Sequence, residues 1–397
     1  MIQLSAGSAF DRLRTLLHKV SPSKDFLEVR MHIGECQLAG EMTIPSADLS
    51  WRKYPPLGGT ETLHEAYGQW LERRFEIDPY TSELDLRWEP TPGTKQAVYV
   101  AILNVLRRAR RRGIAQPKIL QPNPGYPTYL AALEYGDGLS IFYEDVMACT
   151  SSTCVDDIAA LILCHPDNPT GRVYCRKELR TLCDWAHQNN VTLIVDECYI
   201  DLYVNHPPPG FISCVNSKEF LGLSFLVLHS LSKRSSMPGL RHGFVLGDRK
   251  SVEDYARFNR SCGVSVGHAV CASAAAFWSD DDHVEIARKN LSVNLRLAQQ
   301  YLGNYEHFEA PEAGLFLWLN VSNGEEFTRQ LWRDGRVMVM PGKYLAEEYP
   351  RGTNPGNAFI RISLGLKQDE FRQGIFQVRR LLMNEKISKD VVNVRQP

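Results

Sequence analysis

The sequence lacks several patterns that would assign a protein to a class on their own. No apolar stretch reaches the ~18 residues that a membrane-spanning helix requires, so we expect no membrane partner. Basic residues number 45 and acidic residues 46, so the formal net charge of −1 gives no general attraction for nucleic acid. What remains is an ordinary globular composition, 44% hydrophobic and 23% charged. A chain of 397 residues is long enough for roughly two domains.

Metal-binding patterns are also missing, although the chain has ten cysteines. There is no C-x-x-C pair and no Cys/His array with zinc-ligand spacing, so we expect no metal site. Cys149 and Cys154 are the closest pair, and Cys164 ends an apolar run, where a thiol behaves as a small buried hydrophobe. Scattered thiols fit a reducing compartment. The first residues lack the basic and long apolar segments of a signal peptide, so the expected location is the cytoplasm.

One basic cluster departs from this even charge. It consists of Arg107, Arg108, Arg110, Arg111 and Arg112. One interpretation is a patch that binds polyanions. We prefer the solvated end of a helix that begins near Thr94, because the C-terminal dipole of a helix favours cations.

Helix-like and strand-like segments alternate between about residues 60 and 246. One helix face is marked by apolar residues at helical spacing, namely Leu63, Ala66, Tyr67, Trp70 and Leu71. Strand-like runs follow at Lys118–Gln121, Leu161–Cys164, Thr192–Val195, Phe225–Leu228 and Phe244–Leu246. Helical stretches such as Lys177–Gln188 separate several of them. This alternation predicts an α/β domain with a mostly parallel sheet and helices on both faces.

The last part of the chain has a different character. The acidic turn at residues 280–282 precedes a long helix that we expect over residues 283–301, because acids suit a helix N-terminus. Strands are expected at Leu315–Leu319, Val337–Met340 and Ala358–Leu364, among fewer helices. We therefore predict a large domain at 46–285 and a smaller α+β domain at 286–397, joined by the N-terminal segment 1–45.

Small polar clusters follow almost every predicted strand of the large domain. They are Pro122–Pro127, His165–Gly171, Asp196–Tyr199 and Ser230–Lys233. The carboxyl ends of parallel strands converge on one crevice, so we expect these clusters to share a site.

The cluster that contains Lys233 is the most informative. Lys233 follows a buried strand, beside the hydroxyls of Ser230 and Ser232 and shortly before Arg241. Hydroxyls and a guanidinium suit an anionic phosphate, and a lysine near a phosphate site is what a pyridoxal phosphate (PLP) Schiff base needs. Ser-x-x-Lys also occurs in acyl-serine hydrolases, so this motif alone does not distinguish them from PLP enzymes. The other clusters are needed for that distinction.

Each of the other clusters has a use in PLP chemistry. Asp196 at a buried strand end would keep a pyridinium nitrogen protonated, which makes the ring an electron sink. Asn168 and Tyr199 would hydrogen-bond the phenolic oxygen of the ring, and Tyr126 would stack on its face. Lys233 would then act as the base that moves the α-proton of the substrate.

A phosphate site is expected where a tight turn opens a helix. Gly93, Thr94 and Lys95 start that helix, and its N-terminal amides suit a phosphate. Ser230, Ser232 and Arg241 would add hydroxyl and guanidinium donors.

Simpler explanations exist for single residues in these clusters. Lys233 alone would read as a surface lysine, Asp196 as a helix N-cap, and Tyr126 as part of a proline-rich turn. Arg361 would read as a charged residue on a strand edge.

The motifs in combination resemble those of the fold-type I PLP-dependent enzymes, the class I and II aminotransferase family. Asn-Pro-x-Gly at 168–171, Asp-x-x-Tyr at 196–199 and Ser-x-x-Lys at 230–233 occur in this order, with Arg241 after them. Within the family, residues 230–241 and 352–356 look most like N-succinyldiaminopimelate aminotransferases. The resemblance implies a large domain with a seven-stranded type of sheet, and transfer of an amino group between an α-amino acid and an α-keto acid.

The resemblance also implies roles for residues outside the clusters. Arg361 and Gly34 would bind the substrate, with Arg361 on its α-carboxylate. Tyr54 would reach the phosphate of a partner subunit, which implies a homodimer with shared active sites.

Several positions depart from the family pattern on the substrate side. Cys36 stands where such aminotransferases usually carry a proline, and the stretch between Gly34 and Tyr54 is shorter. Four histidines flank motif positions, namely His32, His165, His229 and His242. These departures motivate an alternative, a PLP enzyme of specialised metabolism that performs β- or γ-elimination, replacement or carbon–carbon bond formation. S-adenosylmethionine is the candidate substrate of this alternative.

Overall fold

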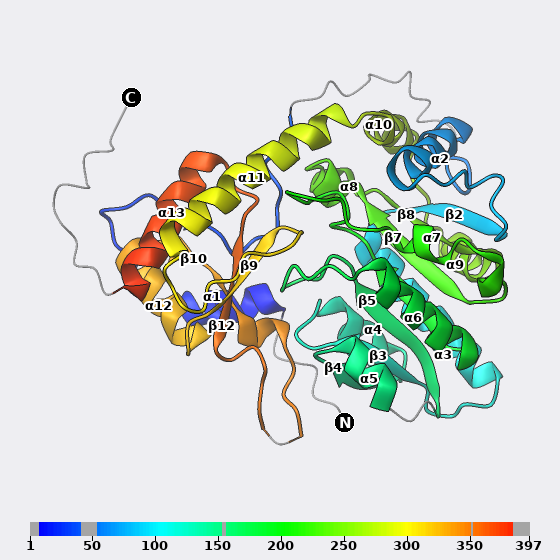
Figure 1. The fold of residues 1–397 in the computed structure, drawn as a ribbon, viewed down its shortest axis with the longest axis horizontal. Coiled ribbons are helices and arrows are strands. Elements are labelled where there is room, and N and C mark those ends of the chain that lie inside the picture. Colours follow the sequence, from blue (N-terminus) through cyan, green and yellow to red (C-terminus); the bar gives the residue numbers. More distant parts are fainter. Residues whose placement is uncertain (1–7, 41–53, 153–155, 351, 384–397) are drawn as a thin grey trace.

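The computed structural model describes residues 8–40, 54–152, 156–350 and 352–383. Figure 1 shows two parts, a large one built around a long sheet and a smaller one that contains the C-terminal helix. Cys154 and the predicted boundary at residues 45 and 46 lie outside the described residues.

Seven strands form the large sheet. In spatial order they are β2 (Leu86–Thr91), β8 (Gly243–Asp248), β7 (Phe225–Ser230), β6 (Thr192–Asp196), β5 (Ile158–Cys164), β3 (Lys118–Pro122) and β4 (Leu139–Tyr143). β8 runs antiparallel to both of its neighbours, and the pairs from β7 to β4 are parallel. The predicted α/β class with a mostly parallel sheet is therefore confirmed.

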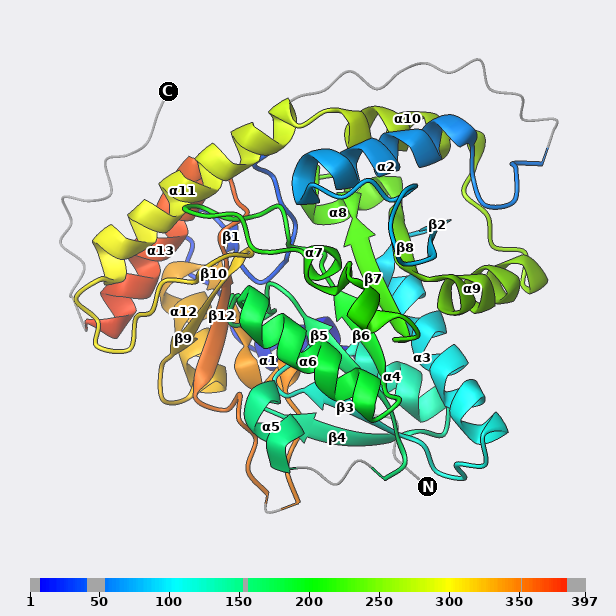
Figure 2. The same cartoon turned by 45° about the vertical axis from the view of Figure 1, so that its right-hand side comes forward.

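Helices cover both faces of this sheet, as Figure 2 shows from a second direction. The core on one face joins the sheet to α2 (Glu61–Phe75), α5 (Val146–Ser152), α6 (Arg176–Gln188), α7 (Phe211–Val215) and α10 (His268–Ser279). The core on the other face joins it to α3 (Thr94–Arg111), α4 (Thr128–Tyr135) and α9 (Arg249–Ser261). Because both faces are covered, every residue of β5 is buried, which explains its unbroken run of apolar side chains.

Two strands of the large sheet were not predicted. β2 contains Arg87, Glu89 and Pro90, which interrupt any apolar alternation, and it lies at one edge of the sheet. β4 forms the other edge, and its first residue, Leu139, is 41% exposed. Edge strands bury fewer side chains, so their hydrophobic signal is weaker.

The smaller part contains a separate core and two short sheets. β9 (Phe316–Asn320), β12 (Phe359–Ser363) and β11 (Met340–Pro341) pair antiparallel, and β1 (Val29–Arg30) pairs parallel with β10 (Val337–Met338). Its helices are α1 (Ala9–Leu17), α11 (Asp282–Leu302), α12 (Gly324–Gly335) and α13 (Gln368–Leu382). The single strand predicted over 337–340 is divided, because its two halves pair with different partners.

The long helix α11 connects the two parts, and it is one residue longer at each end than predicted. Figure 1 shows it running from α10 toward α13. The N-terminal segment pairs with the small part through β1. The domain boundaries themselves stay a prediction.

The basic cluster at the end of α3 differs from expectation at one residue. Arg108 is half-buried and donates hydrogen bonds to the hydroxyls of Ser224 (3.0 Å) and Ser251 (3.2 Å). The other four arginines are exposed, as expected for a solvated helix end. Arg108 is therefore a structural residue that ties α3 to neighbouring elements.

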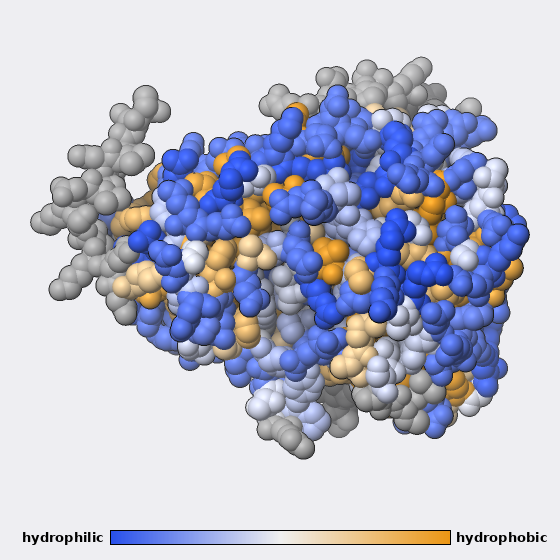
Figure 3. Space-filling model, viewed as in Figure 1, coloured by the Kyte–Doolittle hydropathy of each residue, from blue (hydrophilic) through white to orange (hydrophobic). Residues whose placement is uncertain are grey.

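The surface seen in Figure 3 is mainly hydrophilic, with small hydrophobic areas between. A cleft of about 540 Å³ lies between the two parts, with Asp167, Trp318 and Phe359 among its lining residues and Lys233 outside them. None of the helices in the described ranges is long and apolar enough to cross a membrane.

Candidate active site

The turns that follow β5, β6 and β7 bring most of the predicted site residues together. Asn168 follows β5, Asp196 ends β6, and Ser230 ends β7. Lys233 lies on the single turn α8 (Leu231–Arg234) directly after β7. The three parallel strands are neighbours in the sheet, so their carboxyl ends lie at one edge.

Lys233 faces the N-terminal segment of the chain. Its amine donates a short hydrogen bond to the carbonyl oxygen of Gly34. Burial lowers the pKa of the amine below its usual value, and the nearby Arg361 adds to this effect against an opposing contribution from Cys198. A lowered pKa favours the neutral amine, which is the form that attacks a carbonyl and accepts a proton.

Asp196 is buried, with 6% of its surface exposed, and both of its oxygens have partners. The Tyr129 hydroxyl donates to Oδ2 at 2.9 Å, and the backbone amide of Cys198 donates to Oδ1 at 3.2 Å. Burial raises the pKa of the carboxyl, and these hydrogen bonds oppose the rise. Within the described ranges no cation forms an ion pair with Asp196, and a cation would stabilise its buried carboxylate.

Arg361 enters the site from β12 of the small part. Its guanidinium donates to Oδ1 of Asn168 at 2.9 Å and to the carbonyl oxygen of His32 at 3.3 Å. It also lies 4.0 Å from the centroid of the Phe316 ring. Burial lowers the pKa of Arg361 to about 10. Among the residues that the structure describes, no carboxylate forms an ion pair with it.

Two tyrosines border this group. Tyr199 is buried, and its ring meets that of Phe316 edge-on at 5.8 Å. Burial raises the pKa of Tyr199, and Arg361 opposes that rise. Tyr126 is half-buried and meets Tyr129 edge-on at 5.6 Å, so its ring lies beside the phenol that holds Asp196.

The N-terminus of α3 forms the predicted phosphate side. Gly93 has a φ of 102°, which favours glycine, and a Cβ there would collide with the guanidinium of Arg241. Arg241 donates to the carbonyl oxygens of Pro238 at 2.8 Å and of Pro92 at 3.3 Å. Thr94 begins the helix, and the side chain of Lys95 is exposed, so Lys95 can offer only its backbone amide to this turn.

The two serines of the lysine motif are hydrogen-bonded to each other. The Ser230 hydroxyl accepts a hydrogen bond from the Ser232 amide at 3.1 Å and caps α8. Both side chains are buried, with 4% and 9% exposed. Ser230 therefore has a structural use in addition to its predicted one.

Tyr54 is far from being buried in the single chain. It is 98% exposed. The described part of the chain therefore leaves this aromatic side chain open to solvent, and its predicted role requires a second copy of the chain.

The four histidines that flank the motifs have different surroundings. The Nε2 of His165 donates to the Pro209 carbonyl oxygen at 2.8 Å, and its Nδ1 accepts from the Tyr174 amide at 3.3 Å. Burial lowers the pKa of His165. His229 lies between Tyr67 (2.7 Å) and Glu197 (2.8 Å) in the core. His242 accepts from the Trp278 indole at 3.4 Å, and burial lowers its pKa to about 3.

His32 is the histidine that contacts Arg361. Its carbonyl oxygen accepts from Arg361, and its buried Nδ1 has no hydrogen-bond partner among the residues that the structure describes. Burial lowers the pKa of His32 to about 4.

Three residues in this region were not predicted. Tyr129 holds Asp196, Phe316 contacts Arg361, and the thiol of Cys198 shares a hydrogen bond of 2.9 Å with the Thr94 hydroxyl. Cys198 lies inside the Asp-x-x-Tyr motif, which was a usable signal. Tyr129 and Phe316 are apolar-pattern residues in the sequence, and only the packing identifies them.

These side chains fit PLP. The amine of Lys233, the buried acid Asp196 and the cradle at Gly93 are the three groups that its aldehyde, its ring nitrogen and its phosphate require. PLP would supply an electron-poor ring that stabilises negative charge at the α-carbon of a bound amino acid.

Comparison with known proteins identifies the family. A family model described as aminotransferase class I and II matches residues 42–376. The chain belongs to this family. Its members use pyridoxal 5′-phosphate, and the protein is a PLP-dependent aminotransferase of fold type I.

Individual relatives agree with this assignment. The chain is 29% identical over 314 residues to the 4-dedimethylamino-4-oxo-anhydrotetracycline transaminase OxyQ of Streptomyces rimosus, covering 78% of this chain and 80% of that protein. It is 26% identical over 348 residues to an LL-diaminopimelate aminotransferase of Gloeobacter violaceus, covering 83% and 82%. The crystal structure of the Helicobacter pylori aminotransferase AspB matches with a TM-score of 0.83 at 27% identity, covering 96% of this chain and all (100%) of that one.

Proposed function

We propose that Lys233 binds the cofactor covalently and then moves the proton at the α-carbon of the substrate. Its buried amine has a lowered pKa, which suits both tasks. Asp196 holds the ring nitrogen, while Asn168 and Tyr199 hydrogen-bond the ring oxygen. Tyr126 packs on the face of the ring.

The phosphate is held by the start of α3 together with the lysine motif. Gly93, Thr94 and Lys95 contribute backbone amides at the helix N-terminus. Ser230, Ser232 and Arg241 add side-chain donors. The close approach of Arg241 to Gly93 supports this arrangement.

Arg361 binds the α-carboxylate of the substrate, and this is the observation that carries the proposal. Arg361 is 6% exposed, and no carboxylate among the described residues pairs with it, so an anion would stabilise its buried charge. Arg361 also contacts Asn168 directly, so a carboxylate on it would lie next to the ring oxygen side of the cofactor. The backbone carbonyl oxygen of Gly34 accepts a hydrogen bond from the Lys233 amine on the same side of the site.

Two copies of the chain form the active unit in this proposal, with Tyr54 completing the phosphate site of the partner subunit. The near-total exposure of Tyr54 supports it. We also propose the cytoplasm as the location, because buried cysteines such as Cys164, Cys183 and Cys271 are reduced thiols in the structure.

For the substrate, we propose an amino acid of the diaminopimelate type with a distal acyl group, as in N-succinyldiaminopimelate. The support is the resemblance at residues 230–241 and the LL-diaminopimelate aminotransferase named above. A second candidate is the amination of a natural-product ketone, because the transaminase OxyQ has a similar sequence.

A donor panel tests these proposals. The purified protein with PLP is mixed with N-succinyl-LL-diaminopimelate, LL-diaminopimelate, L-glutamate and cadaverine, and the keto product is measured by mass spectrometry. Cadaverine is the matched control because it has the amines without a carboxylate. We expect at least one of the acids to react and cadaverine to stay unchanged. Equal reaction of cadaverine would refute the role of Arg361.

The second candidate function, amination of a ketone, is tested by offering the ketone as the amino-group acceptor. L-glutamate as donor and an aromatic polycyclic ketone as acceptor would give an aminated product. Product from the ketone, without reaction of either diaminopimelate, would replace the first substrate class with the second.

A further inference from the structure

A buried ion pair connects the two turns that carry the proposed chemistry. Asp201 follows Tyr199 by two residues, and Arg234 follows Lys233 by one. The Nε of Arg234 donates to Oδ2 of Asp201 at 2.8 Å. Both side chains are almost fully buried, with 3% and 2% of these residues exposed.

Asp201 has two further arginine partners. The Nε of Arg74, on α2, donates to Oδ1 at 2.7 Å, and Arg288, on α11, lies 3.5 Å from the same oxygen. Arg288 also donates to the Asp201 carbonyl oxygen at 2.9 Å. One carboxylate is therefore held by arginines from three helices. These charges lower the pKa of Asp201 to about 2, against the effect of burial.

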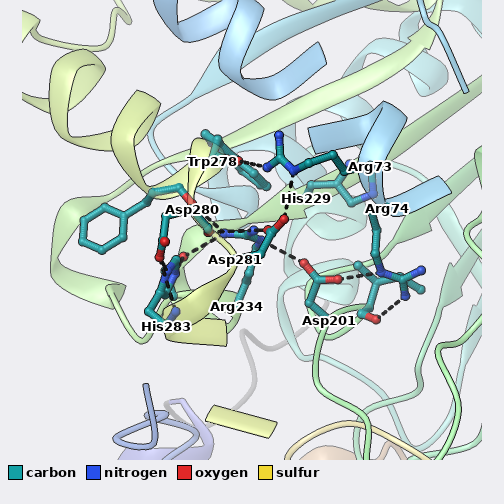
Figure 4. A network of polar contacts seen from close by, with 12 residues as sticks. Arg73, Arg74, Asp201, His229, Arg234, Trp278, Asp280, Asp281 and His283 are labelled. Carbon is teal, nitrogen blue, oxygen red and sulfur yellow. Dashed lines mark hydrogen bonds and ion pairs between the residues drawn. The ribbon is translucent and has the colours of Figure 1, made fainter. Parts of the chain in front are cut away.

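Arg234 uses the rest of its guanidinium at the junction of α10 and α11. It donates to the carbonyl oxygen of Phe277 at 2.7 Å and to that of Asp280 at 3.3 Å, and it pairs closely with Asp281. Figure 4 shows Arg234 between Asp201 on one side and Asp281 on the other.

The residue after Arg234 is held as well. The Ser235 hydroxyl contacts Nε2 of His283 at 2.9 Å, and Nδ1 of His283 contacts Asp280 closely. The short helix α8 is thus tied to the start of α11 through two successive residues.

We propose that the Asp201–Arg234 pair is a positioning device that fixes Lys233 relative to Asp196 and Tyr199. α8 has a single turn, so it has little rigidity of its own. The side chain of Arg234, next to Lys233 and bound to several fixed partners, holds this turn in place. The pair does not touch the reacting atoms. Its role rests on the proposed function of Lys233, Asp196 and Tyr199.

The choice of arginine follows from its shape. A planar guanidinium reaches a carboxylate on one edge and backbone carbonyls on the other, whereas lysine offers one point charge. Arg234→Lys therefore keeps the buried charge and removes the simultaneous contacts. Arg73→Lys is the matched control, because the hydrogen bonds of Arg73 to Asp281 and to the Trp278 carbonyl oxygen do not involve α8.

Hydrogen exchange of the full-length chain tests the proposal without any substrate. We expect Arg234→Lys to raise exchange about tenfold in the peptides that cover residues 196–202 and 231–237, with and without PLP. Arg73→Lys should change the same peptides less than about twofold. Equal exchange in wild type and Arg234→Lys, or equal increases in both variants, would overturn the proposal.

A spectroscopic measurement tests the consequence for the site. The pH midpoint of the visible absorbance of the PLP-loaded protein should shift by about one unit in Arg234→Lys and stay in place in Arg73→Lys. An unchanged midpoint together with increased exchange would reduce the pair to a stabilising contact and contradict a positioning role. If Arg234→Lys does not fold, Arg288→Lys takes its place, since it weakens the hold on Asp201 from α11.

The outcomes separate this inference from the proposed function. Failure of wild type to bind PLP covalently would refute the proposed role of Lys233, while the exchange result would still report on the pair. Covalent binding with no difference between the variants would refute the pair alone.

Discussion

The proposed cofactor side and the proposed substrate side of the site are built in different ways. The cofactor side comes from turns that follow neighbouring strands of one sheet, and each turn carries its polar residues within a few positions of a buried strand. The substrate side joins Gly34 and Arg361, which lie far apart in the chain and contact the cofactor-side residues Lys233 and Asn168. The first arrangement is encoded locally, and the second depends on how the small part packs against the large one.

This difference makes separate perturbation possible. Changes at the ends of β6 and β7 should affect PLP binding first. Changes at Gly34 or Arg361 should leave PLP bound and affect the substrate.

The largest effect is expected at Lys233. Lys233→Ala removes both the covalent attachment and the base, so amino transfer from the best donor of the panel should fall by about 10³-fold or more. The visible absorbance of bound PLP should disappear as well. A Lys233→Ala protein that keeps this absorbance would place the attachment elsewhere.

Arg361 gives the next largest effect, and only on the substrate side. Arg361→Gln should lower kcat/KM by about 10²-fold, because a buried charged pair with the carboxylate is lost. The visible absorbance of PLP should remain. Arg361→Lys, which keeps the charge, should fall between wild type and Arg361→Gln, and loss of PLP in either variant would break the separation of the two sides.

The sequence predicted that the residues of the proposed cofactor side lie together at strand ends, because the signals for this are local. Asp196, Asn168 and Lys233 each follow a run of buried apolar residues, and that context distinguishes them from surface residues. The parallel sheet then follows from the alternation of strands and helices, since parallel strands need helical crossovers.

The sequence did not predict contacts between distant elements. The hydrogen bond from Tyr129 to Asp196, the pair of Asp201 with Arg234 and the contact of Phe316 with Arg361 depend on sheet register and side-chain rotamers. β2 was missed for a related reason, because charged residues and a proline at a sheet edge hide the strand pattern. Sequence patterns identify which residues are polar at a strand end, and packing decides what they meet.

The pH dependence of stability tests the ion pairs of Asp201, which adjoin the proposed cofactor side through Arg234. The pKa of Asp201 falls from its usual 3.8 to about 2, so Asp201 stabilises the folded state above pH 3.8 and loses this contribution as the pH falls toward 2. The shift corresponds to about 2 kcal/mol. The difference in the free energy of unfolding between wild type and Asp201→Asn, from urea titrations, should therefore shrink by about this amount between pH 5 and 2. A constant difference across that range would contradict the ion pairs.

The smallest effect is expected at Gly34. A Cβ there would lie 2.8 Å from Cζ of Phe316, the ring that contacts Arg361, so Gly34→Ala must shift that ring. We expect a loss of about 1–2 kcal/mol in the free energy of unfolding and a higher KM, with PLP absorbance retained. Gly267→Ala is the matched control, since a Cβ at Gly267 meets no atom within 4 Å. Similar losses in both variants would contradict the claim that a Cβ at Gly34 displaces the Phe316 ring.

Chemical reduction of the wild-type protein tests the central claim most directly. Borohydride makes the bond between a protein amine and the PLP aldehyde permanent, and peptide mass spectrometry then locates it. We predict that the reduced cofactor is on Lys233 and on no other lysine. A label on a different lysine, or no label in a protein that binds PLP, would contradict the account of this site.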